Sequence, residues 1–161
     1  MRKTRRFALS ILVFALLLSL IGSGRASAAG GGGAGEVVGY YASWAAAQGH
    51  TPDKLPAEQF TQINYAFAKL EDGRAVLGDP VRDGKTLREL TGLRKRNPDL
   101  KIVLSLGGWD DSAGFSDAAA SAERRRIFAR SCVDLLLAHG LDGVDLDWEY
   151  PVSGGAPGVV H

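Results

Sequence analysis

The sequence contains one cysteine among its 161 residues, which limits how the fold can be held together. Cys132 has no partner in the chain, so an intrachain disulfide is excluded whatever the redox compartment. Phe128 and Leu135 stand at helical spacing from it. This pattern predicts a buried thiol in the core rather than a reactive nucleophile, and the domain must be stabilised by apolar packing.

Long apolar runs are also missing, apart from one near the N-terminus. Residues 7–21 are uncharged and mostly apolar, a basic start precedes them, and small residues follow, ending in an A-x-A site at 26–28. This order is typical of a secretory signal peptide, and the run is too short to span a membrane comfortably. We expect residues 1–28 to be cleaved on secretion to the extracellular space, leaving a glycine-rich linker at 29–35 and no membrane association. The Arg5-Arg6 pair leaves both general and twin-arginine export open.

A basic surface is absent once the predicted signal peptide is set aside. The whole chain has 19 Lys and Arg against 18 Asp and Glu, a formal charge of +1. Five of these basic residues and none of the acidic ones lie in residues 1–28, so the expected mature chain carries a formal charge of −4. Nucleic-acid binding requires a basic surface, and this class of function is therefore excluded.

Strand and helix patterns alternate along the rest of the chain. This order predicts parallel strands joined by right-handed crossovers, in either a barrel or an open doubly wound sheet. Gly107-Gly108 has neither the G-x-G-x-x-G spacing nor the P-loop lysine of a nucleotide-binding open sheet. We therefore favour an α/β barrel with its chemistry at the carboxyl ends of the strands. The expected strands are 37–42, 63–68, 101–106 and 141–149; the expected helices are 85–96 and 121–139, with a helical turn at 57–60 and a turn at 71–74.

An acidic stretch follows the last expected helix and is the strongest indication of a site. Asp145, Asp147 and Glu149 alternate with apolar residues, so they should share one face of an extended strand. Next neighbours on that face are about 6–7 Å apart, which lets each carboxylate feel the charge of the next. Stability alone does not call for like charges at this spacing. The stretch therefore predicts a functional site.

Two kinds of chemistry fit these carboxylates. Hydrolysis of a glycosidic bond needs a carboxylic acid that stays protonated near neutral pH, and a neighbouring charge raises the pKa of such an acid. Glu149, furthest along the strand, is the candidate acid, Asp147 is its charge partner, and Asp145 lies one step deeper and can share a proton with Asp147. Alternatively, the three side chains could bind Mg²⁺ or Ca²⁺, although no His or Asn converges on them. We interpret Asp142 as part of the turn that enters the strand.

Aromatic residues lie near the ends of the other expected strands. Trp44, Phe67 and Trp109 offer flat apolar surfaces of the kind that pack against sugar rings. Phe67 could equally belong to the core, whereas Trp109 follows two glycines in a loop and fits a core less well.

Together, these motifs resemble those of the family 18 glycoside hydrolases. Residues 142–149 match the D-x-x-D-x-D-x-E signature at all four acidic positions, and residues 105–108 resemble the S-x-G-G motif. Residues 38–41 and 65–68 are similar to the first two strands of the family, and Asp-Trp-Glu-Tyr-Pro at 147–151 is most similar to secreted bacterial chitinases. The resemblance extends over residues 36–158.

The resemblance implies a (β/α)₈ TIM barrel and retaining, cofactor-free hydrolysis of β-1,4-linked N-acetylglucosamine in chitin. The sugar's own acetamido oxygen would attack the anomeric carbon. Glu149 would act as general acid and then base, Asp147 would orient the acetamido group, and Asp145 would set the protonation state of Asp147. By the same resemblance, the hydrogen-bonding residues beneath would be Ser105 and Tyr40, and the residues lining the sugar subsites would be Trp44, Phe67, Gly108 and Trp109.

A complete barrel of this kind has about 250 residues, whereas residues 36–161 provide only about four strands. We therefore expect the N-terminal half of the catalytic barrel of a secreted, monomeric chitinase, and we expect this piece to be inactive alone. Two alternatives stay open: a non-catalytic carbohydrate-binding protein on the same scaffold, and an enzyme that cleaves the chitobiose core of N-glycans. The presence of Glu149 argues against the first, and the 147–151 context favours chitin over the second.

Overall fold

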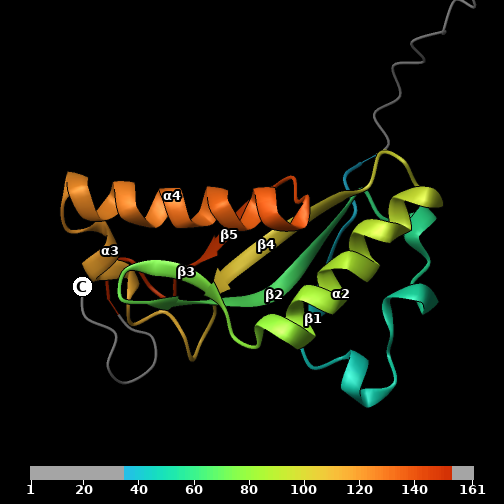
Figure 1. The fold of residues 1–161 in the computed structure, drawn as a ribbon, viewed down its shortest axis with the longest axis horizontal. Coiled ribbons are helices and arrows are strands. Elements are labelled where there is room, and N and C mark those ends of the chain that lie inside the picture. Colours follow the sequence, from blue (N-terminus) through green and yellow to red (C-terminus); the bar gives the residue numbers. More distant parts are fainter. Residues whose placement is uncertain (1–34, 154–161) are drawn as a thin grey trace, which may run out of the picture. The chain divides into compact units, whose positions relative to one another are not determined.

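The structure is a computed structural model that describes residues 35–153 (Figure 1). The predicted signal peptide and almost all of the predicted linker lie outside the described residues. Within the described part, every helix is too short or too polar to cross a membrane.

Four parallel strands form the centre of the fold, in the order β1-β2-β4-β5, and a fifth strand, β3, pairs with β2 in the antiparallel sense. This arrangement confirms the expected α/β fold, and it forms part of a barrel that is not closed within residues 35–153. The strands are β1 (Val38–Ala42), β2 (Gln62–Glu71), β3 (Arg74–Leu77), β4 (Lys101–Gly107) and β5 (Gly143–Asp147). The α-helices are α2 (Pro80–Gly92), α3 (Phe115–Ala119) and α4 (Ala122–His139), and the 3₁₀ turns are η2 (Ala46–Gln48), η3 (Pro52–Lys54), η4 (Ala57–Gln59) and η5 (Leu93–Lys95).

Capping residues determine where the two long helices begin. Ser121 caps α4 by accepting the Arg124 N–H at 3.2 Å, and Gly140 ends this helix in the left-handed conformation, close to the predicted bounds. The prediction for α2 was wrong by five residues at its start. Asp79 accepts two backbone N–H groups of the first turn, and Pro80 occupies the first helical position, which suits its fixed φ.

The hairpin of β2 and β3 was only partly predicted. We expected a turn at 71–74 but no strand after it, and we expected β2 to end at residue 68. In the structure, Asp72 and Gly73 both have positive φ, at 49° and 71°, which is the geometry of a tight two-residue hairpin turn. The turn therefore continues β2 to Glu71 and returns the chain as β3.

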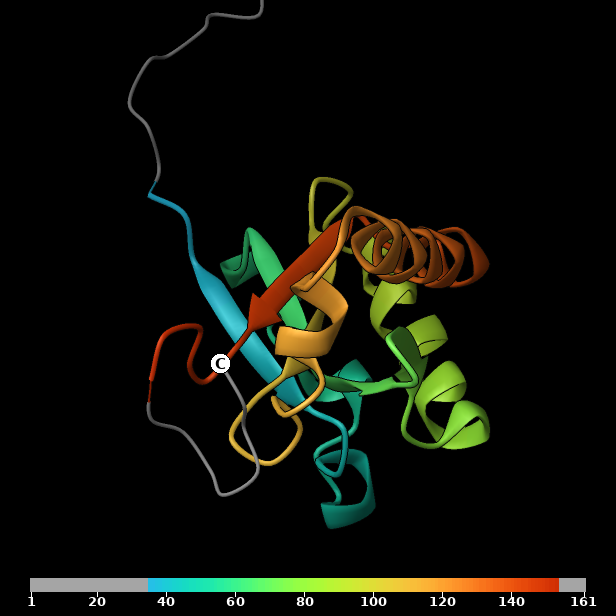
Figure 2. The same cartoon turned by 90° about the vertical axis from the view of Figure 1, so that its left-hand side faces the viewer.

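The parallel strands have two different faces. On one face, side chains such as Leu104 and Leu106 pack with Leu87, Leu90 and Cys132 in the apolar core, beneath α2 and α4. Figure 2 shows these two helices on the same side of the sheet. Cys132 is 5% exposed, as predicted, and burial raises the pKa of its thiol to about 11. The opposite face, which neither helix covers, carries the polar side chains of the strands.

Candidate active site

The Asp145 carboxylate is the centre of a polar cluster on the face that α2 and α4 leave uncovered. Its Oδ2 atom accepts hydrogen bonds from the Tyr40 hydroxyl at 2.9 Å, the Asn64 amide at 3.2 Å and the Ser105 hydroxyl at 2.8 Å. The donors belong to β1, β2 and β4, so all four parallel strands meet at one carboxylate. Removal from water and, second, the hydrogen bond to Asp145 raise the pKa of Tyr40.

Asn64 was missed by the sequence analysis. It is 3% exposed and lies directly beside Tyr40 in the register of β1 and β2. Its Oδ1 atom accepts a hydrogen bond from the Gln62 amide at 2.7 Å, which orients its own amide towards Asp145. The available signal was an amide in the middle of an apolar strand, on the face opposite Ile63 and Tyr65.

Glu149 lies beyond the end of β5. We predicted a continuous strand to residue 149 with three carboxylates on one face, but the strand ends at Asp147, so the prediction was wrong for Glu149. The two carboxyl groups are nevertheless neighbours. Partial burial raises the pKa of Glu149, and the charge of Asp147 and a side-chain hydrogen bond to it add to the effect. A carboxyl group with a raised pKa is suited to donate a proton.

Two glycines bring the loop after β4 close to the end of β5. Gly107 and Gly108 have φ values of 100° and 79°, a region that side chains disfavour. A Cβ atom on Gly107 would collide with the carbonyl oxygen of Asp147, and the Gly108 N–H donates to that oxygen at 2.8 Å. The glycine pair therefore permits the close backbone approach that positions Asp147.

Ser112 is a second residue that the sequence analysis missed. It lies in the same loop, is 1% exposed, and its hydroxyl hydrogen-bonds to the backbone at the end of β5. No motif or spacing distinguishes it from other loop serines.

The predicted aromatic residues line a single groove next to these loops. Trp44 and Trp109 are each 53% exposed, so both present their rings to solvent. The groove has a volume of about 410 Å³ and also contains an ion pair between Lys69 and Asp111, at 3.4 Å, which we did not predict. It adjoins the acidic residues, because Gly107 and Gly108 both line it and contact Asp147. Its lining residues are Ser43, Trp44, Phe67, Lys69, Gly107, Gly108, Trp109, Asp110 and Asp111.

Asp142 lies apart from the other acids of the motif and holds the start of β5 in place. Its Oδ2 atom accepts the Ile102 N–H at 2.7 Å and forms an ion pair with Arg94. Arg94 also donates to the Gly140 carbonyl at 2.9 Å. These contacts match the structural role that we expected for Asp142.

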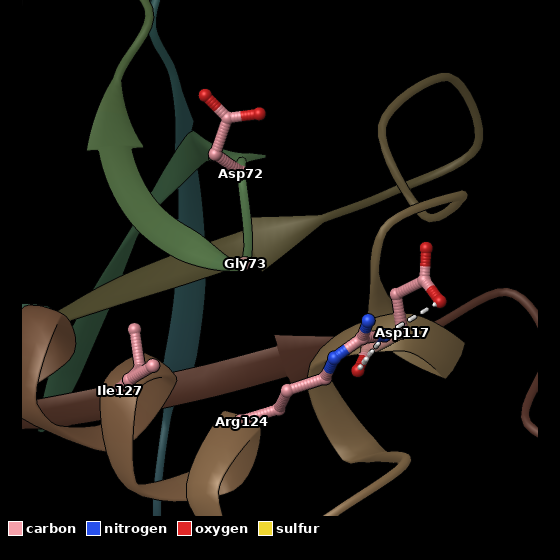
Figure 3. Close-up of a pocket in the computed structure, with 5 residues that line it drawn as sticks. All are labelled: Asp72, Gly73, Asp117, Arg124 and Ile127. Carbon is pink, nitrogen blue, oxygen red and sulfur yellow. Dashed lines mark hydrogen bonds and ion pairs between the residues drawn. The ribbon is translucent and has the colours of Figure 1, made fainter.

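A second cavity, of about 400 Å³, lies between the β2–β3 turn and the beginning of α4 (Figure 3). Its Arg124 donates to the Asp117 carboxylate at 3.0 Å, so the main charges of this cavity already pair with each other. Asp72, Gly73 and Ile127 complete a charged and aliphatic lining. Because it lacks the aromatic surfaces and shares no residue with the groove, we place the candidate active site in the groove.

Metal binding was the alternative use of the acidic stretch. Within residues 35–153, no three His, Cys, Asp or Glu side chains converge as a metal-ligand set. The Asp145 carboxylate is instead held by hydrogen bonds from three neighbouring strands.

Comparison with known sequences relates this chain to glycosyl hydrolases. The sequence model of "Glycosyl hydrolases family 18" matches residues 36–156. Chitinase A1 of Niallia circulans is 36% identical over 206 residues, which cover 98% of this chain and 29% of that protein. Chitinase B of Serratia marcescens is 36% identical over 121 residues, covering 68% of this chain and 24% of that protein. The chain thus spans less than a third of the length of these relatives.

The solved structures that resemble this fold include chitinases. Chitinase ChiA74 from Bacillus thuringiensis superposes with a TM-score of 0.72 at 30% identity, covering 78% of this chain and 29% of that chain. A mutant of catalytic domain 2 of the Ostrinia furnacalis Group II chitinase, solved in complex with penta-N-acetylchitooctaose, superposes with a TM-score of 0.66 at 39% identity. That match covers 72% of this chain and 32% of the other.

Proposed function

The chain belongs to the glycosyl hydrolases of family 18, and we propose that the full-length protein hydrolyses β-1,4-linked N-acetylglucosamine in chitin. The observation that carries this proposal is the Glu149 carboxyl group. Its pKa is raised, it lies beside Asp147, and it follows a strand whose end adjoins an aromatic groove. The names of the relatives, which are chitinases, support chitin as the substrate.

In the proposed reaction, Glu149 gives its proton to the glycosidic oxygen while the acetamido oxygen of the same sugar attacks that sugar's anomeric carbon. The bond to the leaving sugar breaks with its electron pair on the protonated oxygen, and a cyclic oxazolinium ion forms. Asp147 stabilises the positive charge of that ion. Water then attacks the anomeric carbon and displaces the acetamido oxygen, whose bond to that carbon breaks with its electron pair returning to the acetamido group. Glu149 accepts a proton from the water, and the product retains its anomeric configuration.

Two structural features support these roles. Asp147 and Glu149 are neighbours at the end of β5, where the charge of Asp147 helps to raise the pKa of Glu149. In the proposed reaction this pair does not supply the nucleophile, and the substrate's own acetamido group does so. Asp145 is held by three donors, which gives Asp147 a fixed neighbour deeper in the sheet. Trp44, Phe67 and Trp109 would pack against the apolar faces of the sugars.

The proposal includes secretion. Residues 1–28 have the order of a signal peptide, and chitin is an extracellular polymer that a secreted enzyme can reach. N-terminal sequencing of the protein from culture medium tests this: a mature N-terminus near residue 29 supports it, and a retained Met1 contradicts it.

The 161-residue chain alone is expected to be inactive. Within residues 35–153, β1 and β5 are edge strands of an unclosed sheet. Leu146 of β5 is 52% exposed, although its partner in β4, Leu106, is fully buried. An unclosed barrel does not exclude water from its interior or complete a sugar-binding cleft. Detectable hydrolysis of a fluorogenic chitobioside by the purified 161-residue chain would contradict this expectation.

Substrate profiling of the full-length protein tests the main proposal. The protein is incubated with chitin oligosaccharides, a fluorogenic chitobioside and an N-glycosylated glycoprotein, and the products are separated by mass. We expect cleavage of the chitin oligosaccharides and no release of N-glycans. Release of N-glycans without chitin cleavage would show that N-glycans, and not chitin, are the substrate. Sugar binding without any cleavage would show a carbohydrate-binding protein instead.

A further inference from the structure

The Ser112 hydroxyl joins the loop after β4 to the backbone that carries the candidate acid. Its Oγ atom accepts the Glu149 N–H at 2.9 Å. The same hydroxyl lies within donating distance of two carbonyl oxygens, that of Asp147 at 3.0 Å and that of Gly108 at 2.8 Å. The side chain is 1% exposed. Ser112 therefore makes its bonds inside the protein, to residues 35 and 37 positions away as well as within its own loop.

These bonds hold a segment that the strand ladder does not hold. Since β5 ends at Asp147, the Glu149 N–H has no partner in the sheet, and Ser112 is its acceptor. The Asp147 carbonyl accepts from the Gly108 N–H as well. The loop and the end of β5 are thus joined on both sides of Trp148.

We infer that Ser112 is a positioning residue for the reaction proposed above: it holds the Glu149 backbone so that the carboxyl group stays beside Asp147. This inference rests on the proposed function for its kinetic consequences. Its geometric content concerns only the Glu149 amide and carboxyl group, so it can also be measured without turnover.

A second contact keeps the segment folded when Ser112 is changed. The Trp148 ring stacks on Phe115 of α3, with ring centroids 5.4 Å apart and an interplanar angle of 23°. Ser112→Ala should therefore release Glu149 without unfolding the end of β5. The carboxyl group then gains solvent and moves away from the charge of Asp147, and both changes lower its raised pKa.

Steady-state kinetics of full-length Ser112→Ala test the inference. We expect kcat for a fluorogenic chitobioside to fall on the order of 10- to 100-fold, the range for small misplacements of a catalytic group. KM should change little, because the aromatic groove is intact. The alkaline limb of the pH profile of kcat should move to lower pH. Ser112→Thr retains the hydroxyl and should restore most of the lost rate.

Ser131→Ala is the matched control. Ser131 is also buried, accepts the Ala75 N–H at 2.8 Å and donates to the Phe128 carbonyl at 2.7 Å, but it joins β3 to α4 away from the groove. Its replacement should lower thermal stability with kcat and the alkaline limb unchanged. If Ser112→Ala gives this same result, Ser112 is merely structural and the inference is overturned. Should Ser112→Ala not fold, Ser112→Cys, similar in size but a weaker acceptor, should show the same changes at smaller amplitude.

Two NMR measurements separate this inference from the proposed function. Hydrogen exchange of the Glu149 amide should be slow in the wild type and much faster in Ser112→Ala, and the ¹³C titration midpoint of the Glu149 carboxyl should fall. If the wild type cleaves no N-acetylglucosamine substrate, the proposed function fails, and these two measurements still decide on Ser112. Unchanged exchange and an unchanged midpoint would overturn the positioning role even in an active enzyme.

Discussion

Replacing Asp142 with alanine tests whether the first acid of the 142–149 motif serves the fold or the chemistry. The Asp142 carboxylate accepts the N–H of Ile102, the second residue of β4, and pairs with Arg94, which follows α2. Ile102 is 0% exposed, so its N–H would have no partner after the substitution. We predict a clear loss of stability and an unchanged rate per folded molecule.

The magnitude follows from the two contacts. A buried N–H left without an acceptor costs about 1–3 kcal/mol. The Arg94–Asp142 pair is intermediate between surface and buried pairs, with side chains 30% and 28% exposed, so its loss adds about 1 kcal/mol. The free energy of unfolding should therefore fall by about 2–4 kcal/mol. Asp142→Asn retains an acceptor for the Ile102 N–H and should lose about half as much.

Urea denaturation followed by tryptophan fluorescence measures this loss in the full-length protein, and kcat for a fluorogenic chitobioside is measured where every variant is folded. Asp99→Ala is the control, because Asp99 is exposed and has no ion pair within the described part of the chain; it should change stability by less than about 0.5 kcal/mol. A stable Asp142→Ala protein with a much reduced kcat would refute the structural assignment.

Three further predictions concern the site and the core. Burial and the charge of Asp147 raise the pKa of Glu149, so the alkaline limb of the kcat/KM profile should lie at a higher pH than the pKa of an ordinary glutamate. Asp147→Asn should move this limb to lower pH. A limb that does not move would contradict the assignment. Cys132, with a pKa raised to about 11, should not react with a thiol reagent at pH 8 until the protein is unfolded in urea; rapid reaction of the native protein would show that the thiol is accessible. Gly107→Ala should destabilise the fold by more than about 2 kcal/mol. Gly92→Ala, at a helical position with open space around it, should instead stabilise the fold by about 0.5–1 kcal/mol. Equal effects of the two substitutions in urea denaturation would show that the close approach at Gly107 is unimportant.

The strand–helix alternation was sufficient to predict the fold, because it depends on local patterns that each segment carries by itself. Caps and turns were harder. The start of α2 depends on Asp79 and Pro80, which look like ordinary loop residues, and β3 depends on a turn geometry that returns the chain along β2. Both boundaries are set by backbone hydrogen bonds that periodicity does not report.

The site was predictable where side chains cluster in the sequence and unpredictable where only folding brings them together. The acids of residues 142–149 were found by spacing alone. Asn64 and Ser112 contact this stretch from 81 and 37 residues away, through strand register and a loop. An amide within an apolar strand is the one local signal for Asn64, and Ser112 has none. The position of Glu149 past the end of β5 also depends on tertiary contacts, because its N–H bonds to Ser112 instead of to a neighbouring strand.

The most direct test of the account is the rate of hydrolysis of a fluorogenic chitobioside by full-length Glu149→Gln beside the wild type. Glutamine has nearly the same shape but cannot donate the proton, so we predict a rate lower by a factor on the order of 10³ or more, with binding of a chitin oligosaccharide retained. A Glu149→Gln protein that hydrolyses the substrate within a few-fold of the wild-type rate would contradict the central claim.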